Sequence, residues 1–255
     1  SYGRREEQNA IQDPFFSEVI GALEKEIRLN GYFMMLYTSG NVEESLKIAS
    51  SWNIEGLVVL GCQPEDCSKF KQSSKIPVVF IDSYFVGDER QFENVGLKDF
   101  EGGRLIAEYL VSRGHRRIAF LADAEIPVGV DRQRLEGLTE ALEEARVVTD
   151  TAILGSGSLD WEPGIAAVAL DAGTLAALAE KLPEEAPLYG MGVSGSVLEL
   201  LEAGRICALA AVNEYDLGYL TLSAAAGLVS GRYQPPELLT PFLVTGEEMF
   251  DPPYA

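Results

Sequence analysis

The chain has 255 residues, of which 47% are hydrophobic, and a formal net charge of −20 at pH 7. This length and hydrophobic content exclude a disordered chain and allow one large α/β domain or two smaller lobes with a substantial core. The acidic balance excludes binding of a phosphate backbone by this segment alone, and the apolar runs are far shorter than the roughly 20 residues that cross a bilayer.

Short β-rich apolar runs alternate with longer segments of helical spacing, a pattern typical of βαβ units around parallel sheets. The first helix is expected to start at Asp13, which can cap it ahead of Pro14, and to end near Gly31. The next helices are expected near Val42–Ser51 and Pro64–Gln72, with strands at Tyr32–Tyr37, Leu57–Leu60 and Pro77–Ile81. The strands are nearly continuous apolar runs, as in strands buried on both faces.

An irregular polar stretch from Ser83 to Glu93 interrupts this alternation, and we expect a boundary between two lobes there. Further helices are expected near Phe100–Ser112, Arg132–Ala145, Ala172–Leu182, Ser194–Ala203 and Tyr215–Val229. The remaining strands are expected near Ile118–Leu121, Thr149–Leu154, Ile165–Leu170, Pro187–Met191, Ile206–Ala211 and Leu238–Val244.

Few residues suited to catalysis or metal binding occur in the chain. Cys62, Cys67 and Cys207 lack the spacing of a zinc site and are expected to be free thiols. His115, the one histidine, is expected to cap or pack at the end of its helix. No G-x-G-x-x-G follows a strand, and there is no P-loop. We therefore expect no enzymatic activity, no cofactor and no metal.

Polar residues follow several predicted strands, where open α/β sheets bind their ligands. Asp82, Asp171 and Asn213 each come after a strand, and Arg134 and Trp161 end two further segments that follow strands. Carboxylates and amides bond to hydroxyl groups, arginine forks onto oxygens, and an aromatic face stacks on a sugar ring. The pattern indicates recognition of a polyhydroxylated ligand.

Five short motifs support a family resemblance. They are Asp13–Phe16 (DPFF), Ile76–Asp82 (IPVVFID), Asp99–Gly103 (DFEGG), Arg113–Phe120 (RGHRRIAF) and Arg132–Gly137 (RQRLEG). In this order and spacing they resemble the effector-binding domain of LacI/GalR transcription regulators. The resemblance implies the periplasmic-binding-protein type I architecture, an α/β fold of two Rossmann-like lobes with parallel sheets flanked by helices. The N-terminal lobe would comprise residues 1–95 and 214–240, and the C-terminal lobe residues 96–213 and 241–255.

The function implied by the resemblance is that of a cytoplasmic effector sensor. A small sugar or related polyol would bind between the lobes of a homodimer and change how a DNA-reading head binds its operator. We expect that head to lie outside this sequence, because Ser1–Ala10 is polar and leads directly to Asp13. The alternative is a solute-binding protein of a sugar ABC transporter, which the likeness of Asn213–Leu220 to related sugar-binding proteins supports. An upstream head would favour the regulator, and a signal peptide with a lipoprotein cysteine the transporter.

Several ligand contacts follow from the resemblance. Asp82 matches a ligand-facing position after a strand. Arg134 matches the arginine that is separated by two residues from a helix glycine, and Trp161 matches a position where an aromatic residue lines the cleft. Phe15 or Phe16 would stack from the other lobe, and Phe15 is the better candidate because Phe16 fits the apolar face of its helix.

Asp171 matches the aspartate of an Asn-Asp pair, and Asn213 is the nearest amide to a common glutamine position. Structural alternatives stay open: Asp82 as a turn cap, Arg134 as a surface residue and Trp161 as core. From the sequence, Asp82→Ala and Arg134→Ala are both expected to keep the fold and to lose stabilisation by effector.

The chain departs from the family pattern in composition and in length. Polar family positions are occupied by Leu170, Gly192, Val193 and Val212, which puts the identity of the ligand in doubt. Ser1–Gln12 contains no apolar run able to form the family's first strand, and one helix is missing before the strand at Ile165–Leu170. A parallel sheet without its first strand leaves neighbouring apolar faces uncovered, so we favour the omission of segments from this sequence.

Overall fold

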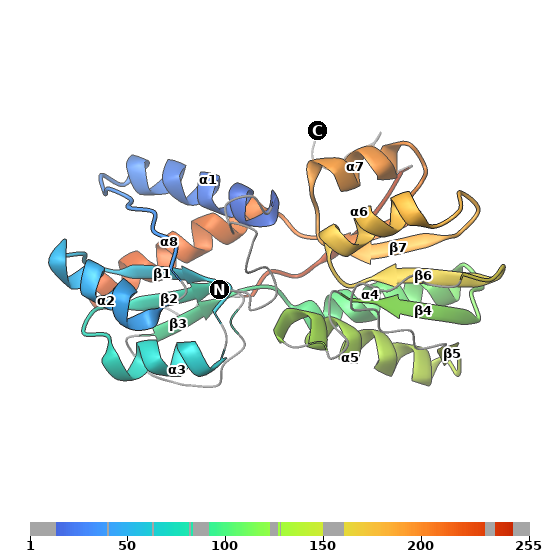
Figure 1. Ribbon diagram of the computed structural model, residues 1–255, viewed down its shortest axis with the longest axis horizontal. Coiled ribbons are helices and arrows are strands. Elements are labelled where there is room, and N and C mark those ends of the chain that lie inside the picture. The colour runs from blue at the N-terminus through green and yellow to red at the C-terminus, as the bar shows by residue number, and fades with distance from the viewer. Residues whose placement is uncertain are drawn as a thin grey trace. The chain divides into compact units, whose positions relative to one another are not determined.

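The computed structural model of the chain describes residues 14–39, 41–62, 64–81, 83, 92–122, 127, 129–149, 161–232 and 238–246. The chain forms two compact units (Figure 1). Unit 1 comprises Ser1–Leu97 and Asn213–Leu239, and unit 2 comprises Lys98–Val212 and Thr240–Ala255. Each unit has a sheet of parallel strands flanked by helices, so the predicted α/β class is confirmed.

Unit 1 is built on a three-stranded parallel sheet. The strands are β1 (Leu57–Leu60), β2 (Val78–Ile81) and β3 (Phe92–Val95), in the order β1-β2-β3. The helices of this unit are α1 (Pro14–Leu29), α2 (Val42–Ser51), α3 (Pro64–Ser73) and α8 (Glu214–Ser230). Helix α8 packs on the strands and on α1, whereas α2 and α3 pack together on the other side (Figure 1).

The core of unit 1 is built around β2, whose successive side chains point to opposite faces of the sheet. All four residues of β2 are buried, and Val78 and Phe80 point to the α2/α3 side, where Phe70 packs edge-on against Phe80. Helix α1 ends where predicted, because Gly31 adopts the left-handed backbone conformation (φ +78°) that such a stop requires.

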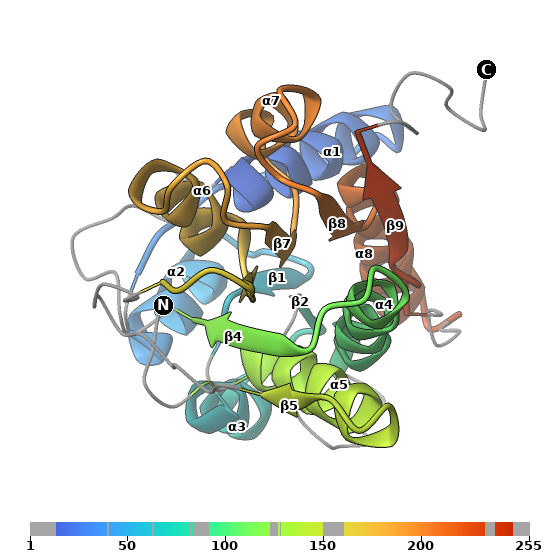
Figure 2. The same cartoon turned by 90° about the vertical axis from the view of Figure 1, so that its right-hand side faces the viewer.

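In its described residues, unit 2 contains a six-stranded sheet and four helices. Figure 2 shows this unit from its side of the molecule. The strand order is β5-β4-β6-β7-β8-β9, and only the β8–β9 pair among these is antiparallel. The strands are β4 (Arg117–Leu121), β5 (Val148–Thr149), β6 (Ile165–Ala169), β7 (Leu188–Met191), β8 (Ala208–Ala211) and β9 (Phe242–Thr245). The helices are α4 (Asp99–Ser112), α5 (Gly129–Glu144), α6 (Ala172–Lys181) and α7 (Gly195–Glu202).

The side chains of the unit 2 strands alternate between two cores. Ile118 and Phe120 pack under α4 and α5, whereas Ala119 and Leu121 pack under α6 and α7. The two helix pairs lie on opposite faces of the sheet (Figure 2). Burial on both faces explains why the strands of this unit are continuous apolar runs in the sequence.

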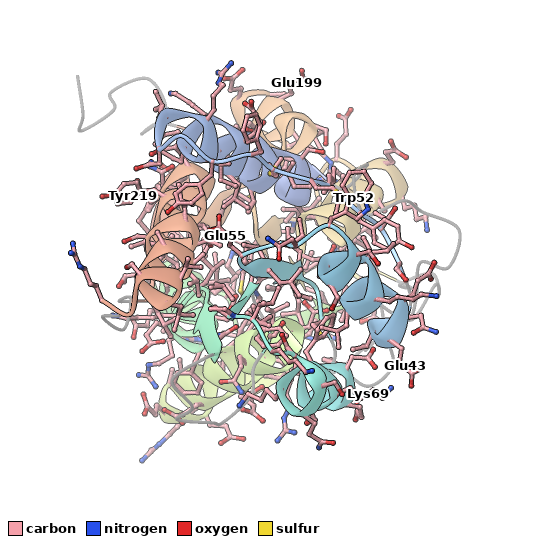
Figure 3. The ribbon with its side chains drawn as sticks, turned by 90° about the vertical axis from the view of Figure 1, so that its left-hand side faces the viewer. Glu43, Trp52, Glu55, Lys69, Glu199 and Tyr219 are labelled. Carbon is pink, nitrogen blue, oxygen red and sulfur yellow. The ribbon has the colours of Figure 1, made fainter. Side chains whose placement is uncertain are left out.

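The predicted strand at Tyr32–Tyr37 is wrong. This segment is irregular, and all six residues are large, apolar and exposed, with Phe33 wholly exposed. The run has a strand-like sequence, but no strand in the described ranges pairs with it, and a strand needs such a partner for its backbone groups. The nearby β1 pairs only with β2 among those strands, and its four residues are half-buried. Trp52 and Tyr219 add further exposed aromatic surface to unit 1 (Figure 3).

One strand was not predicted, and two predicted strands differ in extent. Strand β3 begins within the stretch predicted to be irregular, at Phe92. The strand predicted at Thr149–Leu154 overlaps β5, which comprises Val148 and Thr149, and residues 150–154 lie outside the described residues. Strand β9 begins at Phe242, later than predicted, and Leu239 instead forms an isolated bridge to Leu97. Of the helices in the described ranges, none has the length and hydropathy needed to cross a membrane.

Candidate functional site

The carboxyl ends of four parallel strands meet at one edge of the unit 2 sheet. Strands β4, β6, β7 and β8 are adjacent and run in the same direction. The residues that follow them are Ala122, Leu170, Gly192 and Val212. Ligands of open α/β sheets bind at this edge.

A buried ion pair lies at this edge. Asp99 is the first residue of α4, and Arg134 lies in the second turn of α5. The Arg134 Nε is 2.6 Å from the Asp99 Oδ1, and the two side chains are only 11% and 2% exposed. The Arg134 Nη1 also donates to the backbone carbonyl of Leu170, at 2.7 Å. The guanidinium group therefore connects both helices to the end of β6.

Two glycines allow α4 and α5 to pack closely enough for this pair. A Cβ on Gly137 would overlap the carbonyl of Phe100, and a Cβ on Gly103 would overlap the carbonyl of Arg134. Both glycines belong to the motifs that suggested the family. Close packing here brings the start of α4 against the second turn of α5, so the glycines position Arg134 against Asp99.

The pair is suited to recognition of oxygen-rich ligands. Asp99 and the Leu170 carbonyl hold the planar guanidinium in one orientation, and an oriented guanidinium binds hydroxyl or carboxylate oxygens with geometric specificity. Burial excludes the alternative interpretation of Arg134 as a surface residue. Sequence reasoning did not select Asp99, although its position at a predicted helix start, in a motif preceding Arg134, was an available signal.

Asp171 lies beside this pair and has a structural role of its own. It follows Leu170 and caps α6, because its Oδ1 accepts from the backbone N–H of Thr174 at 2.8 Å. Its Oδ2 accepts from the Thr174 hydroxyl at 2.6 Å. Such a cap satisfies a backbone donor that the helix start would otherwise leave unpaired.

Asn213 is also a helix cap. Its Oδ1 accepts from the backbone N–H of Tyr215 at 3.1 Å, at the start of α8. It begins the segment in which the chain returns to unit 1, and it is exposed.

Trp161 is not brought together with these residues. Its indole Nε1 donates to the carbonyl of Ile165 at 2.9 Å, and Ile165 is the first residue of β6. The side chain is half-buried and packs against the core under α6 and α7, as the alternative interpretation predicts. Trp161 therefore lies at the amino end of β6, opposite to the edge that holds Arg134.

The remaining predicted contacts belong to unit 1. Asp82 lies outside the described residues, as do the side chains of Phe15 and Phe16, whose backbone is part of α1. Asp82 is flanked by the last residue of β2 and by Ser83, which is buried. The Ser83 backbone N–H donates to the Asn94 Oδ1 at 3.0 Å, which connects this position to β3.

The departures from the family pattern have structural explanations. The Leu170 side chain is fully buried under α4 and α5, so its carbonyl, rather than its side chain, is the polar group available at the edge. Gly192 has φ +87°, a backbone conformation that favours glycine. Val212 is buried.

His115 packs at the end of its helix, as predicted. Its Nε2 is 2.7 Å from the Tyr189 hydroxyl, and the two rings meet edge to face. Burial lowers the pKa of His115 and raises that of Tyr189. Within the described ranges, no group of three or more histidine, cysteine or acidic residues could hold a metal ion.

Comparison with known proteins places these features in a wider context. Residues 7–169 match a family model described as periplasmic binding proteins and sugar binding domain of LacI family. The repressor PurR of Mannheimia succiniciproducens is 30% identical over 159 residues, which are 60% of this chain and 47% of that protein. The ribose operon repressor of Haemophilus influenzae is 25% identical, with 61% of this chain and 47% of that protein covered. The chain thus spans about half the length of the curated relatives it matches.

Solved structures show the same fold. The glucose-galactose binding protein GanP of Geobacillus stearothermophilus has a TM-score of 0.77 at 17% identity, with 95% of each chain covered. A putative LacI transcriptional regulator of Bacillus cereus subsp. cytotoxis has a TM-score of 0.72 at 24% identity, with 92% of this chain and 90% of that chain covered. The predicted periplasmic-binding-protein architecture is confirmed.

Proposed function

The chain belongs to the family of periplasmic binding proteins and sugar binding domains of LacI-type regulators, and we propose that it is the effector-sensing part of a transcription repressor. A small sugar-like molecule would bind to it and change operator binding by a separate DNA-reading head. The repressors among its relatives support this proposal. The net charge of −20 supports assigning DNA contact to another part of the protein.

The observation that carries the proposal is the oriented guanidinium of Arg134 at the carboxyl edge of the unit 2 sheet. An arginine held by a carboxylate and a carbonyl loses little further conformational entropy when it binds an oxygen-rich ligand. The ligand we propose is a monosaccharide or related polyol. Two structural relatives were solved with D-xylulofuranose and α-D-tagatopyranose, which are small sugars of this kind.

We propose that Arg134, Asp99 and Asp171 form the unit 2 side of this site. The effector contacts that we propose in unit 1 are Phe15, Phe16, Asp82 and Asn213. Trp161 is left out because its indole N–H is bonded at the amino end of β6. The assembly would be a cytoplasmic homodimer, since symmetric operators are read by dimers.

The second candidate is a solute-binding protein of a transporter. It is favoured by GanP and by a solute-binding protein of Agrobacterium vitis, each with a TM-score of 0.77. Against it stands the 30% identity to a repressor, higher than that to either of these proteins. The complete gene separates the two, because a helix-turn-helix segment before Ser1 belongs to a regulator and a signal peptide with a lipoprotein cysteine to a transporter.

A thermal-shift screen tests the proposal. Monosaccharides, sugar phosphates, polyols and purines are added to the protein, and a ligand raises the unfolding temperature by mass action. Calorimetric titration of the best ligand into Arg134→Lys is then expected to show at least tenfold weaker binding, because lysine cannot hold the forked geometry.

Arg104→Lys is the matched control, since Arg104 bridges α4 and α5 through the exposed Glu140 and Glu144. Its affinity for the ligand is expected to equal that of the wild type. Equal affinity in Arg134→Lys would remove Arg134 from the site. Failure of every ligand class would overturn the proposed function.

A further inference from the structure

Two cysteines of unit 1 occupy a pair of positions that helix geometry brings together. Cys62 lies after β1, two residues before the first residue of α3, and Cys67 is the fourth residue of that helix. Side chains at these two positions pack against each other in the hydrophobic staple found at many helix starts. Here the staple consists of two thiols.

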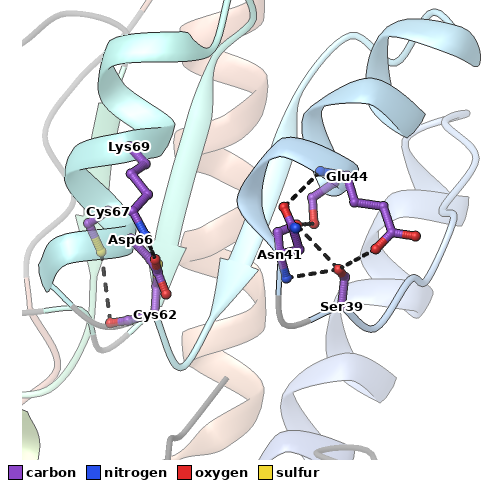
Figure 4. A network of polar contacts seen from close by, with 8 residues as sticks. Ser39, Asn41, Glu44, Cys62, Asp66, Cys67 and Lys69 are labelled. Carbon is purple, nitrogen blue, oxygen red and sulfur yellow. Dashed lines mark hydrogen bonds and ion pairs between the residues drawn. The ribbon is translucent and has the colours of Figure 1, made fainter.

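The contacts agree with this arrangement. The Cys67 Sγ is 3.8 Å from the backbone carbonyl oxygen of Cys62 (Figure 4). Both residues belong to one buried cluster under α2 and α3, in which Cys62 is 8% exposed and Cys67 is 1% exposed. Both cysteines are free. Two thiols held this way have lost most of the freedom that closing a disulfide would otherwise remove.

We propose that Cys62 and Cys67 are a modification site, at which a small peroxide converts the two thiols into an intramolecular disulfide. The Cys67 thiolate attacks one peroxide oxygen, the O–O bond breaks, and Cys67 becomes a sulfenic acid. The Cys62 sulfur then attacks that sulfur, the S–O bond breaks, and water leaves. The two thiols lose two protons and two electrons, and hydrogen peroxide becomes two molecules of water.

The surroundings favour Cys67 as the attacking group. A hydrogen bond between the two thiols lowers the pKa of Cys67 and raises that of Cys62, and a hydrogen bond from Ser83 lowers the pKa of Cys67 further. Burial and the Asp66 carboxylate both act in the opposite direction, without reversing the lowered pKa of Cys67, and the Asp66 carboxylate is paired with the Lys69 Nζ at 2.8 Å (Figure 4). A position near the start of a helix also stabilises a thiolate.

The same pair lies close to the strand end that precedes Asp82. The Ser83 hydroxyl donates to the carbonyl of Ile81 at 3.3 Å and also lowers the pKa of Cys67, so it links the thiol pair to the end of β2. A disulfide at Cys67 removes the ionisable thiol on which Ser83 acts. Oxidation is therefore expected to weaken effector binding through Asp82, and this consequence, unlike the disulfide itself, rests on the proposed function.

The test uses the full chain with Cys207→Ser, which removes the third thiol. The protein is treated with hydrogen peroxide, and thiols are counted with a chromogenic disulfide reagent after denaturation. The expected count falls from two to zero, and the intact mass falls by two hydrogens. Trypsin leaves both cysteines on the peptide Ile48–Lys69, so cleavage after Glu65 is used to show that a disulfide joins the two resulting fragments.

Cys62→Ala and Cys67→Ala in the same background are the matched controls. Each must keep a native circular dichroism spectrum and must fail to lose the two hydrogens. The proposal is overturned if the starting protein retains two thiols at a peroxide dose that oxidises glutathione. It is equally overturned if peroxide adds oxygen to either cysteine without joining the fragments, or joins two chains instead.

Effector binding is measured separately on the reduced and oxidised protein. A lower affinity in the oxidised form, restored by dithiothreitol, supports the coupling through Ser83. An unchanged affinity overturns the coupling through Ser83 but does not count against formation of the disulfide. Absence of any effector counts against the proposed function alone, because disulfide formation is read by mass without a ligand.

Discussion

Replacing Arg134 by alanine tests whether the buried pair in unit 2 is structural as well as a candidate contact. The substitution removes the guanidinium that pairs with the Asp99 carboxylate, which is 2% exposed. It also removes the donor that binds the Leu170 carbonyl. The sequence alone predicts that this variant keeps its fold and loses only its stabilisation by effector, whereas the structure predicts a large loss of stability.

The size of the loss follows from burial. Removing one member of a buried ion pair costs about 3–5 kcal/mol, because the remaining charge stays in a poorly solvated place. A domain is stabilised by only about 5–15 kcal/mol in total, so this loss is a large part of the stability of unit 2. Arg104 bridges the same two helices through the exposed Glu140 and Glu144, and Arg104→Ala is expected to change stability little because solvent screens these pairs.

Urea unfolding followed by tryptophan fluorescence measures the loss in unit 2. Trp161 packs in the core of that unit, and Trp52→Phe in all variants removes the only other tryptophan, which belongs to unit 1. The free energies of unfolding are compared only between variants whose slope against urea concentration (the m-value) is the same. A changed slope would indicate a different unfolding transition and not a different stability.

A paired variant separates the buried charge from the loss of packing. Asp99→Leu with Arg134→Met fills similar volume without charge and is expected to be clearly more stable than Arg134→Ala. If Arg134→Ala loses less than about 1 kcal/mol, or if the paired variant is the less stable of the two, the Arg134–Asp99 ion pair does not stabilise unit 2 as argued.

Three further outcomes are expected. In thermal unfolding, Gly137→Ala should lose about 1–3 kcal/mol because its Cβ overlaps the Phe100 carbonyl, whereas Gly21→Ala, with open space, should gain about 0.5–1 kcal/mol. Asp171→Ala should lose about 1 kcal/mol of α6 capping and Asp171→Ser much less, and equal losses would contradict the cap. Burial holds the folded-state pKa of His115 below its ordinary 6.5. The neutral ring therefore stabilises the fold fully above pH 6.5, and this stabilisation falls as the pH drops toward the folded-state pKa. In urea titrations at several pH values, His115→Gln should abolish this part of the pH dependence.

The strands of unit 2 could be predicted because their burial is recorded in the sequence. A strand covered by helices on both faces must be apolar at every position, as in Ile118–Leu121, where the predicted and observed ranges differ by one residue. Strand β3 has the sequence FENV, whose two polar residues hide it from this criterion. The run Tyr32–Tyr37 has the required apolar character, but whether it becomes a strand depends on a partner that local sequence does not specify.

The candidate site was harder to predict, because one position serves two purposes. In a βα unit, the residue after a strand is often the cap of the next helix, so a polar residue there is expected with or without a ligand. Asp171 and Asn213 are both caps in the structure. The pairing of Arg134 with Asp99 joins residues 35 positions apart and depends on how closely α4 and α5 pack, which only the glycines suggest in the sequence.

In each unit, the groups that could bind a ligand or react lie at the carboxyl ends of the parallel strands. Helices begin at this end, so their first turns offer unpaired N–H groups and favour carboxylates and thiolates. Asp99 and Asp171 of unit 2 and Cys67 of unit 1 all occupy such first turns or caps. The amino ends of the strands differ, because the Trp161 and His115 side chains there form hydrogen bonds to other groups of the protein. Substitutions at the amino ends should therefore change stability alone, whereas those at the carboxyl ends should change stability and effector affinity together.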